Sequence, residues 1–211
     1  MRARSVLLLL CFALTACNGG EDAPSPPPDL DRQDLMGAVL GLEQVGDGWE
    51  QKENAGPNTV QIGGTVGAAN VRPVRAEATS AFDQTEGTGF LSSTLLLVRS
   101  ESVARAVIAT HQESAKKTTW KQDRDDGGEA TFSFSGAVTD LAALGDEMFA
   151  ARLKAVITSA GGQPSEHAVE YVVYSVGPLL VFVVAQDVGA GEFARRLESR
   201  VAQLITPPPV P

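Results

Sequence analysis

Hydrophobic side chains recur along this chain with two different periods, and each period predicts one kind of element. Apolar residues spaced three or four positions apart predict three helices, over residues 31–41, 101–117 and 193–204. Asp31 can cap the first helix, and Ser100 or Ser102 can cap the second. The chain therefore has a helix near its start, one in its middle and one at its end.

Alternation of apolar and polar residues, together with short apolar runs rich in β-forming residues, predicts strands in the segments between these helices. The predicted strands are residues 75–82, 90–98, 131–135, 147–157, 168–176 and 179–186, with one more strand entered from a Gly-rich turn at 45–49. Residues 179–185 are apolar throughout, which predicts a central strand covered on both faces. Short connections at 83–89 and 177–178 predict hairpins.

This order of elements predicts an α+β fold, in which an antiparallel sheet is flanked by helices in a single domain. The chain has 211 residues, 43% hydrophobic and 20% charged, which suits one domain with a real core. Eight of its twelve prolines lie in two end segments, which places the domain at residues 29–206 and a Pro-rich tail at 207–211.

The amino terminus has the pattern of an export signal. Arg2 and Arg4 precede a short apolar run over residues 6–16, which is too short to span a bilayer. Residues 14–17, Leu-Thr-Ala-Cys, resemble the bacterial lipobox. The resemblance implies a signal peptide at 1–16, lipidation of Cys17, and a Pro-rich tether over 17–28. An ordinary secretory signal with a chance cysteine is the alternative.

Cleavage after Ala16 would change both the cysteine content and the charge. Cys11 would be lost and Cys17 would carry lipid, so the domain would have no disulfide. The net charge would change from −9 to −11, because Arg2 and Arg4 leave 15 basic residues against 26 acidic ones. An acidic body is repelled by an anionic membrane, so attachment would depend on acyl chains. The same acidity argues against a nucleic-acid partner.

The polar motifs do not form a recognisable metal or cofactor site. Asp123, Asp125 and Glu129 lie in an acidic loop that invites a calcium interpretation, but the spacing departs from an EF-hand and favours a solvated hairpin loop. His111 and His167 have no metal-ligand spacing and are expected at the surface or rim. We therefore predict no metal site and no cofactor.

Catalytic motifs are also missing from the sequence. It contains no Gly-x-Ser-x-Gly elbow, and the Gly-rich residues 62–67 lack the lysine of a phosphate-binding loop. Asp146 and Glu147 could do acid–base work, but strand neighbours point to opposite faces. Trp49, Trp120, Tyr171 and Tyr174 could line a pocket, although packing is the commoner role of such residues. The two tyrosines are expected on opposite faces. These patterns predict no catalytic residues and no enzyme.

Several short motifs resemble the extracellular sensor domain of PknH-type kinases and its stand-alone lipoprotein relatives in actinobacteria. They are residues 39–42, 45–49, 100–106, 120, 144–147 and 174–179. The chain lacks the disulfide cysteines of that family, and Lys121 and Gln122 stand where one is expected. The resemblance implies a helix-flanked antiparallel sheet with a central cleft for an unknown ligand.

Two functional hypotheses follow from these observations. The first is a lipid-anchored extracytoplasmic binding or sensor-like lipoprotein without catalytic activity. It would be held at the cell membrane by acyl chains on Cys17 and would bind a small envelope ligand or an envelope protein. The alternative is an interaction module of an envelope complex that uses an exposed apolar surface.

Overall fold

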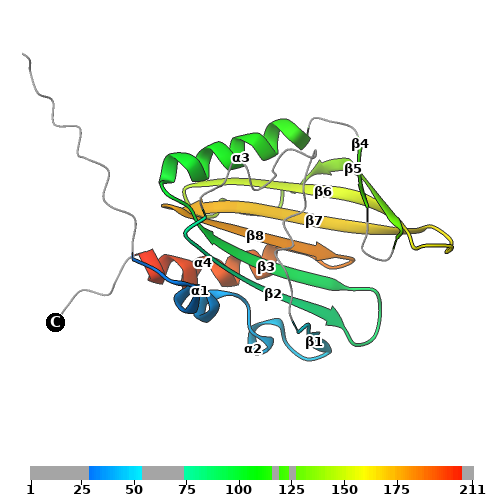
Figure 1. Ribbon diagram of the computed structural model, residues 1–211, viewed down its shortest axis with the longest axis horizontal. Helices are drawn as coiled ribbons and strands as arrows, with labels where there is room; N and C mark the ends of the chain where they lie inside the picture. The colour runs from blue at the N-terminus through cyan, green and yellow to red at the C-terminus, as the bar shows by residue number, and fades with distance from the viewer. Residues whose placement is uncertain (1–28, 54–73, 116–118, 124–126, 206–211) are drawn as a thin grey trace, which may run out of the picture.

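The structure, a computed structural model, describes residues 29–53, 74–115, 119–123 and 127–205. The predicted signal peptide, Cys17, the tether, residues 54–71 and the tail at 207–211 lie outside the described residues. In the described part, eight strands form one sheet in the order β1-β2-β3-β8-β7-β6-β5-β4, and every neighbouring pair is antiparallel. Helices lie on both faces of the sheet (Figure 1). The predicted α+β class is confirmed.

The strands follow the predicted alternation closely. They are β1 (Trp49–Gln51), β2 (Ala76–Gln84), β3 (Phe90–Leu97), β4 (Thr119–Asp123), β5 (Glu129–Ala137), β6 (Glu147–Thr158), β7 (Ser165–Val176) and β8 (Leu179–Gln186). Two differences concern the chemistry below. The sequence predicted no strand at β4, and β7 begins at Ser165, three residues before its predicted start. Pairing with the long strand β6 carries β7 into a segment whose Gln-Pro-Ser sequence favoured a loop.

Strand β8 is the central strand that its apolar run predicted. It lies between β3 and β7, and seven of its eight residues are buried. Its alternate side chains enter two separate cores, with Leu179, Val181 and Val183 in one and Leu180 and Phe182 in the other. A strand without polar positions therefore fits here because both of its faces are covered.

Three helices cover the first face of the sheet. They are α1 (Arg32–Ala38), α2 (Leu42–Val45) and α4 (Gly191–Ile205). Asp31 caps α1 as predicted, in a capping box with Asp34. The first helix is shorter than the predicted 31–41, because α1 ends at Ala38, and Leu42, 44% exposed, begins a separate short helix, α2.

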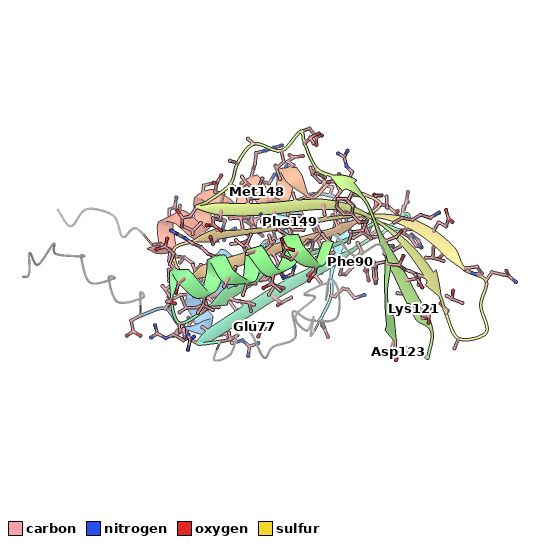
Figure 2. The ribbon with its side chains drawn as sticks, turned by 90° about the horizontal axis from the view of Figure 1, so that it is seen from above. Glu77, Phe90, Lys121, Asp123, Met148 and Phe149 are labelled. Carbon is pink, nitrogen blue, oxygen red and sulfur yellow. The ribbon has the colours of Figure 1, made fainter. Side chains whose placement is uncertain are left out.

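A single helix, α3 (Glu101–Ala115), covers the second face, mainly over β6 and β7. Ser100 rather than Ser102 lies at its amino end, where the Val103 amide meets both the backbone and side-chain oxygens of Ser100. Figure 2 looks onto this face and shows α3 along the sheet, with Lys121 and Asp123 on β4 beyond the end of the helix.

Candidate functional site

The acidic loop that invited a calcium interpretation is only partly described, because Asp125 lies outside the described residues. Glu129 accepts hydrogen bonds from Lys121 Nζ at 2.8 and 3.0 Å. The hydrogen bond from Lys121 lowers the pKa of Glu129. Within the described ranges, no three His, Cys, Asp or Glu side chains are grouped so as to hold a metal ion. The Glu129 carboxylate is thus paired with the Lys121 ammonium group on the neighbouring strand.

The neighbouring carboxylates Asp146 and Glu147 have different partners, although Asp146 lies just before β6 and only Glu147 belongs to the strand. Asp146 Oδ2 accepts from the Gly177 amide at 2.6 Å, in the turn between β7 and β8. Glu147 Oε1 lies 3.7 Å from Arg105 Nε on α3. The two groups do not form a shared acid–base site.

Three of the four aromatic candidates pack in or against the cores, and the side chain of the fourth, Trp120, lies outside what the structure describes. Tyr171 and Tyr174 are fully buried on opposite faces of β7, which confirms the predicted separation. The Tyr174 hydroxyl donates to the Ala194 carbonyl on α4 at 3.2 Å. Trp49 packs edge-on against Phe193 of α4, with ring centroids 6.4 Å apart.

The prediction that His111 lies at the surface or rim is wrong. His111 is 0% exposed, in the core between α3 and the sheet. Its Nδ1 lies 2.9 Å from the Tyr171 hydroxyl, and its ring stacks on the Tyr171 ring at 5.3 Å. Phe182 lies 5.8 Å away on β8. Burial lowers the pKa of His111 to about 4, so this histidine is neutral near pH 7.

His167 is the second histidine that the structure places differently. The sequence put it in a loop, whereas it lies within β7 with its side chain 13% exposed. Its Nε2 is 2.8 Å from Ser165 Oγ, and its Nδ1 is 2.8 Å from Asp187 Oδ2. Ser165, His167 and Asp187 thus form a continuous hydrogen-bonded chain, which we call the Ser165–Asp187 relay.

The sheet register explains how these three residues meet. Ser165 and His167 are two positions apart on β7, so their side chains share one face. Val169 pairs with Gln186, which places Asp187, just beyond β8, beside His167. In Figure 1 the start of β7 and the end of β8 lie at the same end of the sheet.

Further contacts hold the Asp187 carboxylate in place. Oδ2 accepts from the Thr88 hydroxyl at 2.7 Å, and Oδ1 accepts from the Ala168 amide at 3.1 Å. Burial by itself would raise the pKa of Asp187, but the hydrogen bonds from His167, Thr88 and the amide lower it overall. The carboxylate is therefore charged near neutral pH.

No local nucleophile motif in the sequence indicates this relay, because its three residues do not follow a known short pattern. The Ser-x-His spacing at 165–167 was visible, and a strand assignment there would have put both side chains on one face. Asp187 lies twenty residues further on, and only the register of β7 against β8 brings it to His167. Such constellations are recognised by geometry and not by sequence order.

Comparison with known proteins gives a likeness of fold. No model of a known protein family matches the chain, and no curated protein matches it. Among solved structures, the extracellular domain of PknH from Mycobacterium tuberculosis matches with a TM-score of 0.53 and 11% sequence identity. The match covers 84% of this chain and 97% of that domain. At this identity the likeness shows a shared fold, and it confirms the fold that the sequence resemblance implied.

None of the described helices is both long enough and apolar enough to span a membrane. This finding concerns the described residues only.

Proposed function

We propose that this chain is an extracytoplasmic lipoprotein with a sensor-like binding role and without catalytic turnover. Acyl chains on Cys17 would hold it at the outer face of the cell membrane. Its α+β domain would bind a small envelope ligand or an envelope protein. The observation that carries the proposal is the fold shared with an extracellular domain along 84% of the chain, behind a lipobox-like Leu-Thr-Ala-Cys sequence.

The charge of the chain supports anchoring by lipid and not by electrostatics. The net charge is −9 for the whole sequence, and a surface of that sign is repelled by anionic lipids. Stable attachment then needs two or more acyl chains, which is what modification of a lipobox cysteine supplies.

Cys17→Ala is expected to leave the protein unprocessed or to release it from membranes. Membrane fractionation, with a gel-shift assay of processing, measures both effects in a bacterial host. Cys11→Ala is the matched control, because this second cysteine lies within the predicted signal peptide and should change neither result. Normal processing and membrane retention of Cys17→Ala would contradict the proposed anchor.

The alternative function, an interaction module, is favoured by one specific feature. Met36 on α1 and Leu42 at the start of α2 are each 44% exposed, on neighbouring helices of the first face. An exposed apolar surface on these helices is the kind of feature that a protein-binding module would use. Substituting both with serine would then weaken partner capture without affecting small-ligand binding.

Native mass spectrometry of the full chain in detergent distinguishes the two functions. Spectra are recorded before and after exposure to envelope lipid extract. For a ligand-binding protein we expect a persistent additional mass on the folded chain. An unchanged mass would favour the interaction module, and crosslinking in the native envelope would then identify the partner.

A further inference from the structure

The Ser165–Asp187 relay has the arrangement of a nucleophile, a base and an orienting carboxylate. We infer that Ser165 is a reactive nucleophile that accepts an acyl group from an activated carboxylic ester or thioester, with His167 as its base. This inference goes beyond the proposed binding role, because non-covalent binding requires no nucleophile.

Hydrogen bonding fixes the protonation pattern of the His167 ring. The charged Asp187 carboxylate only accepts hydrogen bonds, so Nδ1 must carry a proton to donate across 2.8 Å. In the neutral ring Nε2 then has a free lone pair, and the Ser165 hydroxyl donates to it across 2.8 Å. Gln186 Nε2 is also 3.3 Å from Nδ1, but its amide donates to the Thr88 carbonyl at 3.0 Å. This tautomer is the one that a base for Ser165 requires.

The backbone at Asp187 is held in an unusual conformation. Its φ is +57°, and it is the one non-glycine residue with positive φ in the described part of the chain. Backbone strain of this kind persists only where the surroundings determine it, and it is concentrated at functional sites. Here the Asp187 amide donates to the Ala168 carbonyl at 2.8 Å, so two strands fix the carboxylate relative to His167.

The proposed nucleophile of the relay is exposed to solvent, whereas its base and its carboxylate are largely covered. Ser165 is exposed and open to a reagent from solvent, whereas the His167 side chain is 13% exposed and that of Asp187 is 27% exposed. Ser165 Oγ also lies 3.3 Å from the Ile157 carbonyl, but His167 Nε2 is the nearer acceptor. The hydroxyl therefore keeps its base while it faces solvent.

The chemical step is an acyl transfer without oxidation or reduction. Ser165 Oγ attacks the carbonyl carbon of the ester or thioester, and its proton passes to His167 Nε2. A C–O bond to Ser165 forms, and the bond from the carbonyl carbon to the leaving group breaks. The leaving group departs with that electron pair and takes the proton from His167. The products are an ester on Ser165 and a free alcohol or thiol.

The test uses the full chain in detergent with p-nitrophenyl acetate as the probe. We expect one acetyl group on the peptide that contains Ser165, found by mass spectrometry. Its formation rate should fall at least about 100-fold in Ser165→Ala and in His167→Gln, the range that a general base contributes. Ser135→Ala is the matched control, because Ser135 is an exposed serine of β5 that makes no histidine contact within the described ranges.

Asp187 is a positioning residue, and its test needs a readout beyond the rate. Asp187→Asn tolerates the same backbone conformation but donates through its amide, which would turn His167 into the Nε2–H form. We expect slower acetylation together with a change in the ¹⁵N shifts of the His167 ring. The chain has only two histidines, so the two rings are separated by comparison with His167→Gln.

Acetylation distributed over several serines, or a rate unchanged in His167→Gln, would overturn the inference. So would an Nε2–H tautomer of His167 in the unmodified protein. Release of many equivalents of p-nitrophenol per chain would contradict the absence of turnover in the proposed function, while the nucleophile would stand. Absence of acetylation would also overturn the inference, while the proposed binding role would be unaffected.

Discussion

Replacing Gly145 with alanine is expected to lower the free energy of unfolding by on the order of 3 kcal/mol. Gly145 has φ +58°, and a Cβ there would lie 2.0 Å from the Ser175 carbonyl oxygen on β7. Because the atom that the Cβ would meet belongs to the backbone, no side-chain rotation can remove this clash. The segment cannot move freely either, because the Gly145 amide donates to Glu198 of α4 at 2.7 Å and the Asp146 amide donates to the same Ser175 carbonyl.

Urea denaturation followed by circular dichroism measures this effect. Gly37→Ala is the matched control, because Gly37 is exposed within α1 and a Cβ there meets nothing within 4 Å. Alanine at that position should stabilise the protein by up to about 1 kcal/mol through helix propensity. Equal effects of the two substitutions would show that the close approach at Gly145 is not rigid.

Lowering the pH from 7 to 4 is expected to remove about 3 kcal/mol of stability through His111 alone. In the unfolded chain its pKa is near 6.5, whereas burial lowers the pKa of folded His111 to about 4. Between these two pH values the unfolded state therefore binds a proton on His111 that the folded state does not bind. This contribution to stability is fully present above about pH 6.5 and is lost as the pH falls from about 6.5 to about 4.

The double variant His111→Leu/Tyr171→Phe isolates this contribution. It replaces both partners of the 2.9 Å contact with apolar groups, so no buried hydroxyl is left without a partner. Other groups, including Asp187, titrate equally in both proteins and cancel in the difference. Free energies of unfolding at pH 7 and pH 4 measure the effect. The same decrease in the variant as in the unmodified protein would contradict the assignment to His111.

The amino-acid sequence alone determined most of the local structure. Alternation and short apolar runs located six strands, and the unbroken apolar run of β8 indicated that both of its faces are covered. The helix cap at Asp31 was also readable, because a cap depends on residues within one turn. The lipobox-like motif at residues 14–17 predicts lipidation in the same local way, since export signals are recognised as short contiguous sequences.

Only the tertiary structure decided where the chemistry lies. A period shows which side of an element is apolar, but not which element will cover it. The sequence around His111 therefore did not indicate that it is buried in the core beside Tyr171, which lies sixty residues away in the chain. Strand β4 has little pattern of its own and exists through pairing with β5. The Ser165–Asp187 relay requires β7 to begin at Ser165, which follows from its pairing with β6, and the register of β7 against β8 then places Asp187 beside His167.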